Sequence, residues 1–246
     1  MAGLCRVYGL PLLDSDGYSV AVSQHKFHAS AILSHFGLPA APSWWLTKQG
    51  WWPDKPPDGL RLIAKPTYES ASIGISDDSV FTMDDTVEER LAQQLNAYRQ
   101  PLTVQEFIPG FEVEVPVFDI ETPRTLIAVG IELEGSRSLG HRLLTYRQVF
   151  ADQYSFYNFG EENAASADEM MEIAKRAFKS LGFSGIARVD FRVRPDGTPL
   201  IIETASKPHL TAHSSFAYAV RMAGASQSDL MKFLVGSAVR RHGITA

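Results

Sequence analysis

The 246-residue sequence predicts an α+β fold. Helix-like and strand-like segments are mixed along the chain, without the strict alternation that is typical of a doubly wound parallel sheet. Hydrophobic residues make up 45% and charged residues 21%, as in an ordinary globular protein. The length allows one large domain or two smaller ones, each around a buried core.

Four segments are expected to be helical, because apolar residues recur at helical spacing between capping and stop signals. The second segment opens with Thr82 and Asp85 in capping-box spacing. The predicted helices run from near Ser23 to Gly37, from Thr82 to about Arg99, from Ser166 to Gly182, and from near Ser226 to Gly243.

Six runs between these helices are strand-like, and they cover residues 60–65, 102–106, 112–118, 125–131, 185–193 and 199–204. Residues 44–59 contain all four tryptophans and are interpreted as a strand followed by a loop. Trp51 and Trp52 either pack in the core or loop, or form a patch for a partner.

Composition excludes several classes of protein. The net charge is −5 without a basic run, which argues against a nucleic-acid partner. No apolar stretch approaches the roughly 20 residues that span a bilayer, and the N-terminus does not resemble a signal peptide. The single cysteine, Cys5, excludes an internal disulfide and is interpreted as a buried thiol. We therefore expect a reduced, soluble, cytoplasmic protein.

A hairpin that brings two carboxylates together is the strongest functional signal. The Pro-Asp-Gly sequence at 195–197 indicates a turn. A two-residue turn there pairs Asp190 with Glu203, and Arg188 with Ala205. Two carboxylates directly across a ladder destabilise a sheet by up to about 1 kcal/mol. A divalent cation removes that penalty, and magnesium, which prefers oxygen ligands and keeps substrate phosphates in its shell, fits best.

The same alternation divides the hairpin into two faces. The alternative to a metal site is an exposed strand pair in which Arg188 and Arg192 neutralise the acids. The predicted polar face carries Arg188, Asp190, Glu203 and Ala205, and the predicted apolar face carries Val189, Phe191 and Ile202.

Lys65 follows a strand-like run, and Pro66 keeps it extended. The next residues, 67–74, are mostly small, and such a loop can direct backbone N–H groups at phosphate oxygens while the lysine supplies a charge. Lys26 lies in the first turn of a predicted helix, where the dipole disfavours a cation. It either reaches an anion or is simply solvated.

Glu112 and Glu114 share one face of a predicted strand, with Val113 and Val115 on the other. They are either functional or solvated carboxylates at a sheet edge.

Taken in chain order, these features resemble the D-alanine:D-alanine ligases of the ATP-grasp superfamily, from about Tyr8 to the C-terminus. The matching motifs are Lys26; Lys65-Pro66 with Glu69, Ser72 and Gly74; residues 104–108 with Gly110 and Glu112; Arg188-x-Asp190-Phe191; Ile202-Glu203; and the tail of residues 203–214.

The resemblance implies an ATP-grasp fold, in which two α+β subdomains clasp ATP between them. Residues 1–25 are then a lead-in segment from a preceding domain, 26–103 the small subdomain with the phosphate loop, and 104–246 the large subdomain. The implied activity is ATP-dependent joining of a carboxylate to an amine through an acyl phosphate, with amino acids as substrates. The alternatives are an ATP-grasp enzyme with another product, such as a cyclised amide or an acyl phosphate, and a non-catalytic nucleotide-binding or partner subunit.

The resemblance also implies a role for each matching residue. Asp190 and Glu203 bind magnesium, and Arg188 stabilises the oxyanion of the tetrahedral intermediate. His209, His213 and Ser214 lie at the substrate site. The residues that contact ATP are Lys26, Lys65, Ser72, Gln105, Glu106, Ile108, Glu112 and Ile202.

The sequence departs from the family pattern at several positions. Ala205 replaces an asparagine of the metal site, and His209 replaces a glycine at the reaction centre. Ser70 and Ala71 replace a glycine and a serine of the phosphate loop. The loop of about residues 132–160 lacks the family's lysine and tyrosine, for which Arg142 or Arg147 is a candidate substitute.

Family members begin with a separate α/β domain that helps to form the first substrate's site, and this sequence starts near the end of that domain. We expect a homodimer contact, a partner chain or a smaller site to replace it, unless the protein no longer ligates.

Overall fold

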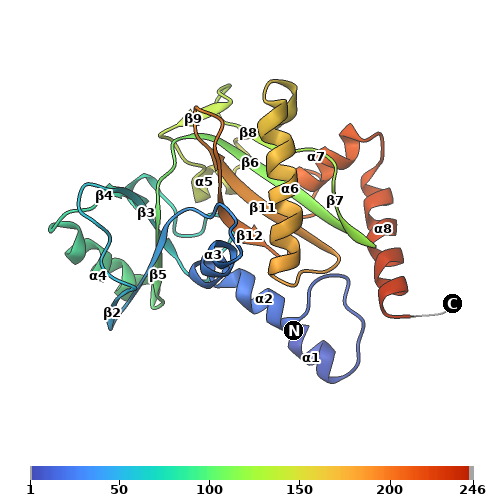
Figure 1. Ribbon diagram of the computed structural model, residues 1–246, viewed down its shortest axis with the longest axis horizontal. Helices are drawn as coiled ribbons and strands as arrows, with labels where there is room; N and C mark the ends of the chain where they lie inside the picture. The colour runs from blue at the N-terminus through green and yellow to red at the C-terminus, as the bar shows by residue number, and fades with distance from the viewer. Residues whose placement is uncertain (1, 244–246) are drawn as a thin grey trace.

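The computed structural model describes residues 2–243 and confirms the α+β class, with two antiparallel sheets and helices packed around them (Figure 1). A five-stranded sheet lies at one side of the molecule and a larger seven-stranded sheet at the other. No helix within residues 2–243 is both long and apolar enough to cross a membrane.

The chain begins with three helices, α1 (Ala2–Val7), α2 (Gly17–Gln24) and α3 (Lys26–His35). The sequence predicted a single helix beginning near Ser23. Two helices form instead because His25 breaks the helical backbone between them and caps α3, its Nδ1 accepting the His28 N–H at 3.3 Å. This break places Lys26 at the first position of α3.

The smaller sheet has the strand order β2-β1-β5-β3-β4. Its strands are β1 (Ser43–Thr47), β2 (Gly50–Trp52), β3 (Arg61–Pro66), β4 (Val80–Thr82) and β5 (Leu102–Glu106). Helix α4 (Val87–Tyr98) packs its buried leucines against this sheet, and a 3₁₀ turn (Asp77–Ser79) precedes β4.

Two sequence predictions in this sheet are wrong. Thr82 does not cap a helix, because it ends β4 and pairs with Arg61, so that α4 begins at Val87. The tryptophan-rich segment is a two-stranded hairpin rather than one strand and a loop, since Trp45 pairs with Trp52 across β1 and β2.

The larger sheet has the path β10-β8-β6-β11-β12, and β7 and β9 also pair with β6. Its strands are β6 (Gly110–Ile120), β7 (Thr122–Thr125), β8 (Val129–Glu132), β9 (Ser138–Gly140), β10 (Ser155–Asn158), β11 (Ile186–Val193) and β12 (Pro199–Ala205). The strand predicted at 125–131 is therefore two strands, which pair with β6 at different places. Helix α5 (Tyr146–Phe150) and a 3₁₀ turn (Phe159–Glu161) lie in its connections.

Helix α6 (Ala164–Ser180) covers one face of the larger sheet (Figure 1). Val113, Val115 and Val117 of β6 point toward it and form the main core with residues of β11. Phe118, on the opposite face, packs with α7 (Ser215–Met222) and α8 (Gln227–Arg241). Because side chains alternate along β6, Glu112 and Glu114 also lie on the face opposite α6.

The β11–β12 hairpin confirms the predicted pairing of Asp190 with Glu203 and of Arg188 with Ala205. The predicted two-residue turn is wrong, because the Arg194 N–H donates to Thr198 O and closes a three-residue loop over 195–197. A register shift beside Asp190 compensates for the extra loop residue.

The register shift also corrects the predicted position of Ile202. Strict alternation put Ile202 on the apolar face. The bulge instead leaves Ile201 in the core beneath α6, while Ile202 and Glu203 both line a cavity.

The two sheets meet where β5 leads into β6 through residues 107–109. The predicted boundary between residues 103 and 104 falls inside β5, which pairs throughout with β1 and β3 of the smaller sheet. We therefore place the boundary of the proposed subdomains after Glu106. The Ala41 N–H also donates to Ile201 O at 2.9 Å, so that a second segment joins the sheets.

Candidate functional site

The main cavity lies between the two sheets and has an empty volume of about 680 Å³, part of which opens to solvent. The residues that the sequence assigned to nucleotide contact all line it, together with Glu203: Lys26, Lys65, Ser72, Gln105, Glu106, Ile108, Glu112 and Ile202.

Lys65 lies on β3 and is 9% exposed. Its ammonium donates to Gln105 Oε1 at 2.9 Å, on the neighbouring strand β5. Burial lowers the pKa of Lys65, and the nearby charge of Lys26 lowers it further, against the opposite effect of Glu203. A phosphate group would relieve this unfavourable environment, because it brings negative charge to both lysines.

Lys26 is held in the cavity wall rather than solvated. Its ammonium lies 3.1 Å from Glu203 Oε1 and also donates to the Glu69 carbonyl oxygen. Burial alone would raise the pKa of Glu203, but the charges of Lys26 and Lys65 outweigh burial and lower it. The two lysines therefore form a positive end of the cavity around one carboxylate.

The loop after β3 turns sharply toward the cavity. Ala71 and Ser72 both have left-handed backbones, with φ of 52° and 55°, and Gly74 follows with φ of 79°. A Cβ at Gly74 would lie 2.7 Å from the Pro66 ring. Residues 70, 72 and 73 line the cavity, so the loop has the placement that a phosphate-binding loop requires.

Arg192 is a site residue that the sequence analysis missed. The interpretation of Arg192 as part of an exposed strand pair is wrong, because its side chain is 4% exposed. It donates to Ile108 O at 2.8 Å and to Gly140 O at 2.9 Å, and lies 3.1 Å from Glu112 Oε2. It thereby fixes Glu112 and the segment between the sheets at the cavity wall.

Asp190 is 6% exposed and forms a bidentate pair with Arg188. Nε and Nη2 of Arg188 donate to Oδ1 and Oδ2 at 2.6 and 2.8 Å. Burial raises the pKa of Asp190, and Arg188 acts in the opposite direction. From the sequence, we expected a carboxylate pair that only a cation neutralises. The structure instead neutralises Asp190 with Arg188, and Glu203 with Lys26.

The chemistry of these donors fits a magnesium ion. Asp190 and Glu203 present oxygens from paired strands, and Glu203 does so beside the cavity. Within residues 2–243, no three acidic, histidine or cysteine side chains converge closely enough to hold an ion alone. Two protein carboxylates agree with magnesium, which usually keeps several waters and binds substrate phosphates.

Glu114 is a second residue whose place the sequence left open. It stands opposite Asp190 on β6, and its Oε1 lies 3.3 Å from Nη1 of Arg188. Its side chain is 12% exposed, so the interpretation as a solvated edge carboxylate does not hold.

The three predicted substrate residues do not line the main cavity. His209 is exposed in the loop after β12. His213 Nδ1 lies 2.8 Å from Asp152 Oδ1 and so joins this loop to the segment after α5. Ser214 caps α7 by accepting the Ala217 N–H at 3.2 Å. Their assignment to a substrate remains a prediction.

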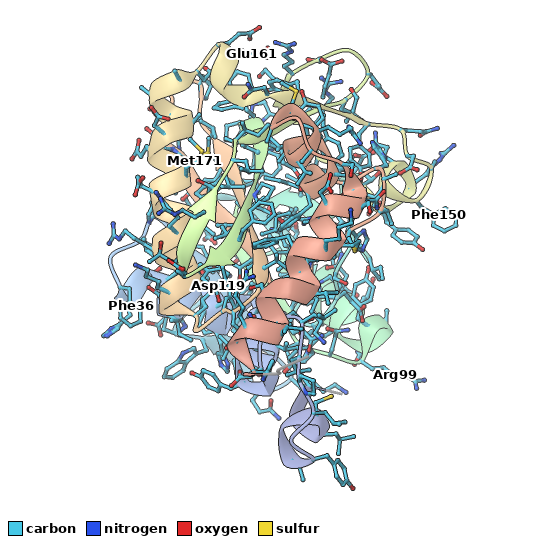
Figure 2. The ribbon with its side chains drawn as sticks, turned by 90° about the vertical axis from the view of Figure 1, so that its right-hand side faces the viewer. Phe36, Arg99, Asp119, Phe150, Glu161 and Met171 are labelled. Carbon is cyan, nitrogen blue, oxygen red and sulfur yellow. The ribbon has the colours of Figure 1, made fainter. Side chains whose placement is uncertain are left out.

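The segment of residues 132–160 contributes two leucines, Leu143 and Leu144, to the cavity, and neither Arg142 nor Arg147 is among its lining residues. Arg142 instead lies 3.4 Å from Glu134. Phe150, at the end of α5, projects away from the molecule and is 80% exposed (Figure 2).

Comparison with known proteins identifies relatives along nearly the whole chain. A family model described as "D-ala D-ala ligase C-terminus" matches residues 32–236. D-alanine–D-alanine ligases from Bordetella petrii and Pelotomaculum thermopropionicum are 26% and 28% identical, over 97% and 98% of this chain and 71% and 76% of their own lengths. The chain spans half to three quarters of the length of the curated relatives it matches.

A solved structure shows the same fold. The D-alanine–D-alanine ligase of Bacillus anthracis complexed with ATP superposes with a TM-score of 0.75, covering 98% of this chain and 75% of the other. The sequences are 19% identical, so this likeness concerns the fold alone.

Proposed function

Because the chain belongs to the family of D-ala D-ala ligase C-terminal domains, we propose that it is an ATP-dependent ligase that joins a carboxylate to an amine, with amino acids as substrates. One observation carries the proposal. The residues assigned to ATP surround one cavity, and Glu203 of the paired carboxylates stands in its wall beside two lysines.

In this proposal the adenine lies against the segment between the sheets, at Gln105, Glu106 and Ile108. Glu112, oriented by Arg192, binds the ribose hydroxyls. The phosphates lie between the loop after β3 and the ammonium groups of Lys26 and Lys65. Ser72 and Ile202 complete the wall.

Asp190 and Glu203 would hold magnesium at the phosphate end. Bound there, the ion neutralises phosphate oxygens and orients the γ-phosphate for transfer. The contribution of the chain is mainly positional, since little covalent chemistry falls to protein groups in phosphoryl transfer.

The reaction has two steps. A substrate carboxylate oxygen attacks the γ-phosphorus and ADP leaves, which gives an acyl phosphate. The amine nitrogen then attacks the acyl carbon, phosphate leaves, and the nitrogen loses a proton. Arg188 stabilises the negative oxygen that develops in the second step, a role typically worth about 10²–10³ in rate. His209, His213 and Ser214 are proposed to bind the second substrate from the loop after β12.

The test is product formation by the purified protein. Incubation with ATP, magnesium and D-alanine, and separately with pooled D- and L-amino acids, should release ADP. Mass spectrometry should show a product that weighs the sum of two substrates less one water. Release of ADP with an acyl phosphate or a cyclised amide would identify a different ATP-grasp reaction. ATP binding without ADP release from any pool would identify a non-catalytic subunit. The predicted homodimer or partner chain is tested separately by light scattering.

A further inference from the structure

Glu114 lies in one row with the two proposed metal ligands, yet the proposed function gives it no role. Strand β11 runs between β6 and β12, so Glu114 and Glu203 stand opposite Asp190 from its two sides. Glu114 is largely buried, and its ionic partner is Arg188 at 3.3 Å. Three neighbouring strands therefore each contribute one acid to this row, beside the guanidinium of Arg188.

Arg188 occupies both oxygens of Asp190, at 2.6 and 2.8 Å. A cation shared by Asp190 and Glu203 needs at least one of these oxygens. That oxygen already accepts from Arg188, so the arriving cation repels the guanidinium beside it and weakens or displaces that hydrogen bond. A guanidinium left without a carboxylate in a mostly buried place is strongly unfavourable, so the displaced group needs another acceptor nearby.

We propose that Glu114 is a positioning residue that retains Arg188 when Asp190 turns to the cation. This inference rests on the proposed function, because it concerns the same magnesium–ATP site. Without the cation, Arg188 neutralises Asp190 and touches Glu114. With the cation bound, Arg188 pairs with Glu114 and remains beside the reacting centre. Neither the arginine nor Asp190 is left unpaired in either state.

The direct test is a crystal structure of the parent protein with magnesium and a non-hydrolysable ATP analogue. We expect at least one oxygen of Asp190 on the cation and the guanidinium of Arg188 on Glu114. A structure in which Arg188 keeps both oxygens of Asp190, or in which Glu114 itself coordinates the cation, overturns the inference while leaving the proposed function in place. Failure of the parent protein to bind the magnesium–nucleotide overturns both.

A solution test uses the affinity for Mn²⁺ in the presence of the same analogue, measured by electron paramagnetic resonance. The parent, Glu114→Gln, Arg188→Met and the double variant form a cycle. We expect Glu114→Gln to weaken cation binding about tenfold when Arg188 is present, and about threefold in the Arg188→Met background, where only the lost charge acts. An equal or larger loss in the Arg188→Met background shows that Glu114 acts on the cation directly, and contradicts the inference.

Asp119 offers a matched control on the same strand. It lies near α8 at the far end of β6 (Figure 2), with Oδ2 3.8 Å from Nη1 of Arg241. Asp119→Asn also removes one paired carboxylate from β6 and should leave Mn²⁺ affinity unchanged. A loss equal to that of Glu114→Gln would show a general effect of charge and count against a specific role for Glu114.

Discussion

Replacement of Lys65 by methionine removes one charge from the phosphate end of the cavity and keeps most of the side chain's volume. Lys65 is almost fully buried and donates to Gln105 Oε1 at 2.9 Å. Its ammonium shares this end of the cavity with Lys26, which is already paired with Glu203 at 3.1 Å. Of these two lysines, Lys65 is therefore the one with no carboxylate at ion-pair distance among the described residues, and phosphate is its natural counter-ion.

The expected magnitude follows from that position. A hydrogen bond to a charged group contributes about 1.5–3 kcal/mol, and each 1.4 kcal/mol changes a binding constant tenfold. We therefore expect Lys65→Met to weaken ATP binding by about 10- to 150-fold. Isothermal titration calorimetry in the presence of magnesium measures this affinity directly.

Lys48 provides the control, because it is exposed in the turn between β1 and β2, away from the main cavity. Lys48→Met should bind ATP like the parent. Equal ATP affinity in Lys65→Met and the parent, with the fold intact by circular dichroism, would refute the assignment of Lys65 to the phosphates.

Three further predictions concern stability and specificity. Gly110→Ala should lower the free energy of unfolding by more than about 2 kcal/mol in urea titrations, because a Cβ there would lie 2.0 Å from Val193 O at a φ of 130°; an unchanged midpoint would contradict this close approach. Burial and the adjacent His28 lower the pKa of His25 to about 4. Between pH 6.5 and pH 4 the unfolded state therefore binds more protons than the folded state, so the free energy of unfolding decreases as the pH falls through that window. In urea titrations, the free energy of unfolding of the parent should decrease between pH 7 and pH 4 by up to about 3 kcal/mol more than that of His25→Asn, and equal decreases would refute this. His209→Gly should change the products or rates across an amino-acid panel, and an unchanged panel would make His209 only a loop residue.

The sequence predicted the longer helices and the central strands because their signals are local, but it missed short elements such as α5, α7, β9 and β10. The Ser226 capping box begins α8 as expected, with Asp229 at its third position. The pairing of Asp190 with Glu203 was also predicted. It is correct only because the register shift from the longer loop is cancelled by the bulge beside Asp190. A Pro-Asp-Gly turn fits loops of different lengths, so sequence alone does not fix such a register.

The charges of the site were harder to predict, because their partners are distant in the chain. Arg192 donates hydrogen bonds to the carbonyl oxygens of Ile108 and Gly140, which lie 84 and 52 residues away in the chain. Lys26, at the start of α3, pairs with Glu203 of β12, which lies near the other end of the chain. Spacing within one strand carries no information on such partners, so Arg192 was given no role beyond that of an exposed residue.

Ligation through an acyl phosphate transfers an oxygen atom from the carboxylate substrate to the released phosphate. The carboxylate substrate found in the amino-acid panel is labelled with ¹⁸O at both oxygens, and the inorganic phosphate released during turnover is analysed by mass spectrometry. We expect one ¹⁸O in each phosphate, because the carboxylate oxygen that attacks the γ-phosphorus leaves with phosphate when the amine attacks. Phosphate without ¹⁸O, released together with ADP, would mean that water and not the carboxylate attacks ATP, and would contradict ligation through an acyl phosphate.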